Sequence, residues 1–367
     1  MGAVDGEGYA KLADTLLSCG KFAFGCEAHS TVFRGPGYPG FLALINLPFG
    51  QVSYEWTVIV QILLNAGSAA LLFSLVFNEK GLRAANTALL VFLSVPVLHV
   101  FVPRFHLENV LLFFLLAVVA LLVRRSEYNP MWSTIAAAVL LGLGILVKQT
   151  FLLLPIILAS VVWRVARQPR LALVLLLLPY GVVLPWSVRS SALAQSLLPV
   201  HTNAGFNMLI GNETVKKFPE APFTGSVLWD YGYAAVRKSG SDSEPRTATQ
   251  EYEEDARLLD IGLRQLCEEP IILVKILINP ILFFTLGSTL LNSIVLGVPA
   301  LILVFFSARG VWAGHLSAFL SILCGVITVY YLFVHIPLYA IGRFSIPVLP
   351  LMIVLAMGYR QKMQILE

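Results

Sequence analysis

Long apolar blocks alternate with short polar segments along most of the chain. Solid apolar runs such as "VLLFFLLAVVALLV" lack the strict alternation of a transmembrane β-strand, and they therefore predict helices. A helix needs about 20 apolar residues to cross a bilayer, and most of the blocks approach that length. The predicted membrane helices are 53–77, 84–102, 107–123, 131–147, 150–163, 170–187, 290–307, 312–334 and 345–359. The pattern predicts an all-α polytopic membrane protein with about nine transmembrane helices.

Composition supports this class. The 367 residues are 57% hydrophobic and only 13% charged, and the mean hydropathy of +0.80 lies far above that of soluble globular proteins. The net charge of +4 comes largely from Lys and Arg in short loops between apolar blocks. Such a distribution indicates membrane topology and argues against nucleic-acid binding.

Basic residues mark alternate loops. They are Lys80 and Arg83, then Arg124 and Arg125, then Arg164, Arg167 and Arg170. By the positive-inside rule these loops are cytoplasmic, so the remaining polar segments, 1–52, 102–108, 148–150 and 188–270, lie outside. The apolar segments 38–50 and 271–288 are predicted to lie in the plane of the outer interface, because a spanning 271–288 would place Arg309 on the wrong side.

This topology divides the sequence into four regions. They are a first external loop with interfacial helices (1–52), a six-helix transmembrane module (53–187), an external loop with in-plane helices (188–289) and the C-terminal transmembrane helices (290–367). An amphipathic helix is predicted after residue 250, and no chemistry is assigned to it. Cys19 and Cys26 could pair in an oxidising compartment, but their spacing favours two unpaired residues.

Unusual polar residues gather on the outer side. Asp5 and Glu7, in "DGEGY", are candidate catalytic carboxylates, although composition alone favours a solvated tail. The candidate substrate-binding residues are Arg34, Tyr38, His106, Glu108, Lys148, Arg189, His201, Asn203, Asn207, Asn212 and Arg343. Ionisable groups near the bilayer usually face a cavity and mark a substrate path.

Three of the stretches also have ordinary structural explanations. Arg34, in "FRGPGYPGF", suits phosphate oxygens, and it equally suits a headgroup anchor. Glu108 opens a helix and satisfies its dipole, and His106 either orients a substrate or caps that helix. The Asn/Gly-rich segment 188–213 suits a polyhydroxylated ligand, the alternative being an exposed loop.

Taken together, several motifs resemble the GT-C superfamily of membrane glycosyltransferases. They are "VDGEGYAKLADTLLSCGKF", "FRGPGYPGFLALINLPFG", "LGLGILVKQTFLLLPIIL", "PWSVRSSALAQSLLPVHTNAGFNMLIGNE" and "GRFSIPVLPLMIVLA". The group they resemble most contains the dolichyl-phosphate-mannose-protein mannosyltransferases and the 4-amino-4-deoxy-arabinose transferases. The resemblance runs from about residue 4 to about residue 357.

The resemblance implies transfer of a sugar from a polyprenyl-phosphate donor to a lipid, glycan or protein acceptor, with inversion. Asp5 occupies the place of the family's catalytic carboxylate, and Glu7 is a helper because Gly6 stands where the family often has a second acid. Arg34 matches the residue that contacts the carrier phosphate, although Gly35 replaces the first of two common prolines. No cofactor is expected besides the lipid-linked donor, and nothing in the sequence supports a divalent metal.

The implied location is the plasma (inner) membrane, with the active site facing the periplasm or exterior. The family's first transmembrane helix is expected to be missing, because no apolar helix precedes Asp5. The alternatives are a transporter or flippase of lipid-linked sugars and a non-catalytic subunit of a glycan assembly complex. The sequence shows no clear internal repeat, which makes the transporter the weaker reading.

Overall fold

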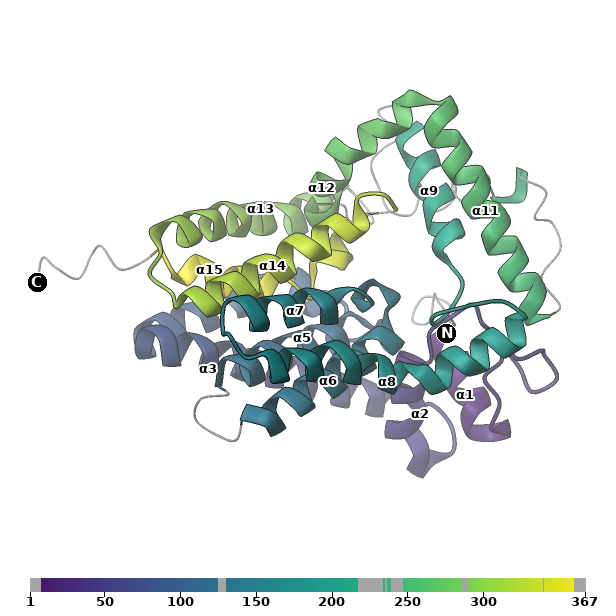
Figure 1. The fold of residues 1–367 in the computed structure, drawn as a ribbon, viewed down its shortest axis with the longest axis horizontal. Helices are drawn as coiled ribbons and strands as arrows, with labels where there is room; N and C mark the ends of the chain where they lie inside the picture. The colour runs from purple at the N-terminus through teal and green to yellow at the C-terminus, as the bar shows by residue number, and fades with distance from the viewer. Residues whose placement is uncertain are drawn as a thin grey trace, which may run out of the picture. The chain divides into compact units, whose positions relative to one another are not determined.

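The computed structural model describes residues 8–124, 130–216, 234, 236–238, 247–285, 290–338 and 340–359. Every regular element among these residues is a helix, which confirms the all-α prediction. In chain order the helices are α1 (Tyr9–Cys19), α2 (Gly37–Asn46), η1 (Leu47–Phe49), α3 (Tyr54–Ser94), α4 (Val97–Val100), α5 (Glu108–Val123), α6 (Pro130–Val147), η3 (Gln149–Phe151), α7 (Leu154–Arg164), α8 (Pro169–Ala194), α9 (Ala204–Lys216), α11 (Ala248–Glu268), η4 (Pro270–Val274), α12 (Lys275–Thr285), α13 (Leu290–Ala313), α14 (Ala318–His335), η5 (Gly342–Ser345) and α15 (Leu349–Met357) (Figure 1).

The chain forms two compact units, each built from segments that are distant in sequence. Unit 1 comprises residues 1–54, 185–298 and 332–345, and unit 2 comprises residues 55–184, 299–331 and 346–367. The two regions predicted to be external loops, 1–52 and 188–289, both fall within unit 1. Residues far apart in the sequence therefore share one unit, and unit 1 also takes in the segment that carries Arg343.

Unit 2 is organised around two helices that are buried along nearly their whole length. Helix α5 buries most of its side chains, and every residue of α15 is buried. A helix that is apolar all round belongs in the interior, and α15 accordingly packs against α5. Helix α6 packs on another side of α5.

The number of membrane-spanning helices is not confirmed as nine. Among the described residues, four helices are long and apolar enough to cross a bilayer: Tyr54–Ser94, Pro130–Val147, Pro169–Ala194 and Ala318–His335. Shorter apolar helices cover Glu108–Val123, Gln149–Arg164, Pro270–Phe284 and Gly297–Ala313. Helix α15 has 9 residues, where 345–359 was predicted, and at about 1.5 Å per residue it is shorter than a bilayer core.

The first two predicted membrane helices both fall within α3, one on either side of a kink. The two helical parts of α3 meet at Gly81, within the predicted loop, where the backbone leaves helical geometry with φ 77° and ψ −177°. Glycine tolerates this conformation because it has no Cβ. The second part ends at Ser94, not at residue 102 as predicted, because Pro96 disfavours helical geometry in the residue before it.

In unit 1, helices α9 and α11 lie side by side (Figure 1). Their close approach depends on glycine: a Cβ at Gly205 would lie 1.9 Å from the carbonyl oxygen of Asp255 and 2.5 Å from the backbone nitrogen of Leu259. Asp255 also caps α9, because its carboxylate accepts hydrogen bonds from the backbone N–H groups of Ala204 and Phe206, both at 3.0 Å. Helix α11 thus holds the N-terminus of α9 by contact and by charge.

The Asn/Gly-rich part of the predicted external region, 188–213, is mainly helical. Helix α8 extends to Ala194 and α9 begins at Ala204, which leaves 195–203 as the connection between them. Local composition favoured a loop, but the cap supplied by Asp255, some fifty residues further along the chain, stabilises the helix. The helices predicted within 38–50, after residue 250 and within 271–288 are present as α2 with η1, α11, and η4 with α12.

We predict that Gly205→Ala destabilises the protein, since the added methyl group would collide with the backbone of α11. Overpacking of this kind costs about 1–3 kcal/mol, so the thermal midpoint of the detergent-purified protein should fall by several degrees. Gly40→Ala in α2 is the matched control, because a Cβ there meets nothing within 4 Å. Equal midpoints for the two variants would contradict the close approach of α9 and α11.

Candidate functional site

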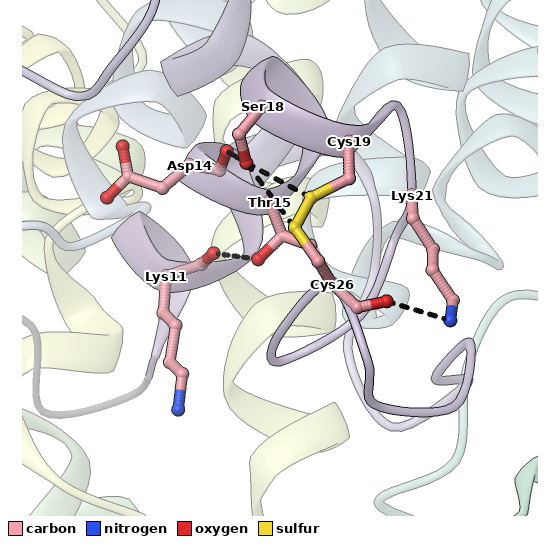
Figure 2. Close-up of a disulfide and its surroundings, with 7 residues drawn as sticks. All are labelled: Lys11, Asp14, Thr15, Ser18, Cys19, Lys21 and Cys26. Atoms are coloured by element: carbon pink, nitrogen blue, oxygen red, sulfur yellow. Dashed lines mark hydrogen bonds between the residues drawn. A yellow bond between two sulfur atoms is a disulfide. The ribbon is translucent and has the colours of Figure 1, made fainter.

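A disulfide closes the loop that follows α1. Cys19 and Cys26 are bonded, with their Cα atoms 5.9 Å apart, so the prediction of two unpaired cysteines was wrong (Figure 2). Within this loop Lys21 Nζ donates to the carbonyl of Cys26 at 3.3 Å. Disulfides form and persist in oxidising compartments.

The segment after this loop is held by one carboxylate from α11. Glu251 accepts hydrogen bonds from His29 Nε2 at 2.8 Å, from the Thr31 hydroxyl at 2.8 Å and 3.0 Å, and from the backbone N–H of Val32 at 2.6 Å. Thr31 and Val32 are fully buried. The chain just before Arg34 therefore has a fixed conformation.

Arg34 is partly buried against aromatic rings. Its guanidinium carbon lies 4.8 Å from the centroid of the Phe33 ring and 5.6 Å from that of Tyr9. Tyr9 packs edge-on against Tyr38 at 5.2 Å, and Tyr38 has no exposed surface. Tyr38 thus supports the ring beneath Arg34 and does not present a surface to a ligand.

The connection between α8 and α9 carries His201. This connection folds back on α8, where Trp186 Nε1 donates to the carbonyl of Val200 at 3.0 Å. The His201 ring is hydrogen-bonded through Nδ1 to the carbonyl of Thr202 at 2.5 Å. The pKa of His201 is lowered to about 4, mainly by burial and also by the positive charge of Arg34, against the opposing effects of the Thr202 carbonyl and Asp255. His201 is therefore neutral at physiological pH and lies within electrostatic range of Arg34.

Arg189 lies beside the same segment. Its guanidinium carbon is 4.3 Å from the Trp186 ring centroid and 5.6 Å from that of Phe22, and Nη1 donates to the carbonyl of Thr31 at 3.4 Å. Arg34, Arg189 and His201 are thus brought together around residues 31–34 of unit 1.

The three predicted asparagines have different surroundings. Asn203 adopts φ 131°, and its buried Oδ1 has no hydrogen-bond partner among the described residues. Asn207 donates to the carbonyl of Asn203 at 2.8 Å. Asn212 is fully buried: it accepts from Lys275 at 2.7 Å and donates to the carbonyl of Gly262 at 2.8 Å, so the protein itself uses its amide.

Arg343 belongs to η5, which packs against α12 in unit 1. Its guanidinium carbon lies 5.5 Å from the Phe344 ring centroid. Lys275 donates to the carbonyl of Pro337 at 2.6 Å, and Asn279 donates to those of Ile336 at 2.7 Å and Leu338 at 3.1 Å. Two side chains of α12 therefore hold the segment that leads into η5.

His106, Glu108 and Lys148 belong to unit 2. Gln61 on α3 donates to the carbonyls of Val102 and Arg104, which fixes the loop before His106. His106 is 9% exposed and packs against Phe101, and Glu108 is 2% exposed in the first turn of α5, where it complements the helix dipole.

Lys148 separates α6 from η3 in an extended conformation, and its side chain is partly buried. The tight turn that follows is braced by hydroxyl groups: Tyr330 donates to the carbonyl of Thr150 at 2.5 Å and Tyr180 to that of Leu152 at 2.7 Å. The position of Lys148 is therefore well defined within unit 2.

The two candidate catalytic carboxylates, Asp5 and Glu7, lie outside the described residues. Among the residues that are described, no three His, Cys, Asp or Glu side chains gather closely enough to hold a metal ion.

Glu251 is the site residue that the sequence reasoning missed, since no chemistry was assigned to its helix. The buried positions of α11 are Ala248, Glu251, Leu258 and Gly262, at intervals of three, seven and four residues. Glu251 thus occupies the apolar face of an amphipathic helix. A charged residue in that register was the signal that could have identified it.

Comparison with known proteins supports a membrane glycosyltransferase. Residues 34–188 match the family model described as "Dolichyl-phosphate-mannose-protein mannosyltransferase". The match covers less than half of the chain and begins at Arg34. No protein with a curated description matches the chain.

Solved structures extend the likeness in fold. The archaeal oligosaccharyltransferase AglB from Archaeoglobus fulgidus, in complex with an inhibitory peptide and a dolichol-phosphate, aligns with a TM-score of 0.54 and 13% identity, over 95% of this chain and 45% of that one. ArnT from Cupriavidus metallidurans aligns over 95% of this chain and 72% of its own, with TM-scores of 0.42 in the apo state (15% identity) and 0.44 bound to undecaprenyl phosphate (14% identity). The chain thus spans less than half the length of AglB. The family match and the fold shared with AglB support a membrane glycosyltransferase of the GT-C superfamily.

We predict that His201 makes the protein less stable in mild acid. Between pH 6.5 and about 4 the unfolded chain binds a proton at His201 that the folded protein excludes, so stability falls as the pH decreases through this window. His201→Gln should flatten that part of the curve of thermal midpoint against pH. His315→Gln, at an exposed histidine, should leave the curve unchanged, and parallel curves for wild type and His201→Gln would contradict the buried, neutral ring.

Proposed function

We propose that this chain transfers a sugar from a polyprenyl-phosphate donor to an acceptor at the outer face of the membrane. The observation that carries the proposal is the match of residues 34–188 to a family described as a mannosyltransferase that uses dolichyl-phosphate-mannose. AglB, whose fold is similar, is described in complex with a dolichol-phosphate, which supports a lipid-linked donor.

In this proposal unit 1 lies at the outer surface of the plasma (inner) membrane, facing the periplasm or exterior. The disulfide between Cys19 and Cys26 supports an oxidising environment for that unit. Leu277 on α12 is 72% exposed and Leu44 on α2 is 70% exposed, as expected of in-plane helices that rest on lipid. Lys275, the charge that makes α12 a poor spanning helix, is buried in protein instead of facing lipid.

Exposed tryptophans of unit 2 support a membrane–water boundary at the ends of its helices. Trp132, Trp163 and Trp312 are 69%, 60% and 90% exposed, and each lies near the end of a helix that borders a loop predicted to be cytoplasmic. Tryptophan prefers the membrane–water interface. The bundle is then proposed to cross the membrane about nine times, with the shorter apolar helices of unit 2 completing the crossings.

Arg34 is proposed to bind the phosphate of the donor. The rings of Phe33 and Tyr9 lie against the guanidinium and orient its planar fork of donors, and the neutral His201 nearby adds no charge of its own. Arg189 adds a second positive charge beside the same segment. Asn203, with its buried Oδ1, is proposed to accept from a sugar hydroxyl. Arg343, also in unit 1, is proposed as a further phosphate contact.

Asp5 is proposed as the catalytic base. Its carboxylate would take the proton of an acceptor hydroxyl or amine while the acceptor atom bonds to the anomeric carbon. The bond from that carbon to the phosphate oxygen breaks, and its electron pair leaves with the polyprenyl phosphate, whose charge the arginines stabilise. A single displacement of this kind inverts the anomeric centre.

We predict that Asp5→Asn lowers the rate of sugar transfer by about 10²- to 10⁴-fold, the usual contribution of a general base. The measurement is release of radiolabelled sugar from a polyprenyl-phosphate sugar in proteoliposomes, with candidate acceptors present. Glu27→Gln, an exposed carboxylate of the same N-terminal region, should retain the wild-type rate. Full activity in Asp5→Asn would remove Asp5 as the base.

For Arg34, substitution by Gln should raise the KM for the lipid-linked donor by at least about tenfold, since a charge-assisted contact to phosphate is lost. Arg34→Lys should recover part of the affinity, because the charge returns without the planar fork. Arg264→Gln, at an exposed arginine paired with Asp260 on α11, is the control. An unchanged KM for Arg34→Gln would show that the phosphate binds elsewhere.

A further inference from the structure

We propose that Glu251 is a positioning residue that sets the geometry of Arg34 for the donor phosphate, an inference that rests on the proposed function. Glu251 lies on α11, more than 200 residues from Arg34 in the sequence. It acts through the backbone of residues 29–32 and not by contact with the substrate.

The carboxylate of Glu251 binds residues 29–32 through both of its oxygens. Both carboxylate oxygens are used: Oε1 accepts from His29 and Thr31, and Oε2 accepts from Thr31 and from the backbone of Val32 at 2.6 Å. The side chain of Glu251 is only 7% exposed. A buried carboxylate with this many donors is an anchor, because its charge is stable only while the donors stay in place.

The other side of the same segment is tied to the residue that follows His201. The backbone N–H of Thr202 donates to the carbonyl of Val32 at 2.9 Å. Val32 thus receives one restraint from α11 through its N–H and another from the α8–α9 connection through its carbonyl. Arg34 follows Val32 by two residues, and His201 precedes Thr202, which is hydrogen-bonded to Val32. A shift of this segment would therefore displace both side chains.

Arg189 completes the arrangement. Its Nη1 donates to the carbonyl of Thr31 at 3.4 Å, and its positive charge is attracted to Glu251. Apolar contacts seal the network, since Val32 is packed with Ala194, Leu198 and Ala248, all at most 6% exposed. Water cannot easily replace Glu251 as acceptor in this cluster, so its removal would leave three donors unsatisfied.

The test measures binding of a short-chain polyprenyl phosphate to the detergent-purified full chain. Glu251→Gln keeps the size of the side chain but loses its charge and one acceptor, and it should weaken binding about tenfold through misplacement of Arg34. Glu253→Gln, an exposed carboxylate two residues along the same helix, should bind like wild type. The double variant Glu251→Gln, Arg34→Gln should bind no more weakly than Arg34→Gln alone, because Glu251 acts through Arg34.

Thr31 provides a second, milder probe in case Glu251→Gln does not fold. Thr31→Val removes the hydroxyl that Glu251 binds, whereas Thr31→Ser retains it, so Val should weaken binding more than Ser. Thermal midpoints of all variants separate loss of folding from loss of affinity.

The outcomes separate this inference from the proposed function. If Arg34→Gln weakens binding while Glu251→Gln and Thr31→Val do not, the inference is overturned and the proposed function stands. Additive losses in the double variant would also overturn it, because Glu251 would then act independently of Arg34. If Arg34→Gln binds like wild type, the proposed role of Arg34 fails and the inference fails with it.

Discussion

The arrangement of unit 1 depends on the burial of one negative charge. Glu251 is taken out of water by α11 and compensated by donors that all come from residues 29–32. Desolvating a carboxylate costs several kcal/mol unless hydrogen bonds replace its water, so the partners are constrained as strictly as the acid itself. This single requirement links the N-terminal region, the end of α8 and the α8–α9 connection, which are otherwise separated by long stretches of sequence.

The same helix also determines where the rest of the unit can lie. Gly205 allows the backbone of α9 to touch that of α11, and Asp255 satisfies the N–H groups at the start of α9. From there Asn212 receives Lys275 of α12, and Lys275 reaches the carbonyl of Pro337. A continuous chain of contacts thus runs from α11 through α9 and α12 to the segment before Arg343. The polar residues in this series of contacts hold the helices together. Asn212 is therefore buried, although its sequence context suggested a ligand contact.

The hydrophobic pattern of the sequence predicted the helices well, because helix formation depends mainly on local sequence. The apolar blocks gave an all-helical membrane protein, and amphipathic spacing located α11 because both follow from the period of a helix. Helix ends were less predictable: the second part of α3 ends at Ser94 and not at residue 102, and α15 begins at Leu349, after η5, and not at residue 345. Residues 204–213 are helical because Asp255, about fifty residues away, caps the helix. The pairing of Cys19 with Cys26 depends on how the loop between them folds. Sequence spacing alone reveals neither. For the candidate site, Arg34, Arg189 and His201 could be selected from their residue types and their sequence context. Glu251, which contacts the segment that they surround, could not, because it lies on the apolar face of α11.

Two arginines of unit 1 share a mode of support that suits an anion at a membrane surface. Arg34 lies over Phe33 and Tyr9, and Arg189 lies over Trp186 and Phe22. A guanidinium is weakly hydrated and planar, so an aromatic ring can cover its face while its edge keeps hydrogen-bond donors in the plane. Lysine is held less well in this way, because its compact ammonium group is strongly hydrated and has no planar face. Aromatic support therefore lowers the cost of placing positive charge next to lipid and fixes the direction in which its donors point, which is the combination that a phosphate on a hydrophobic tail requires.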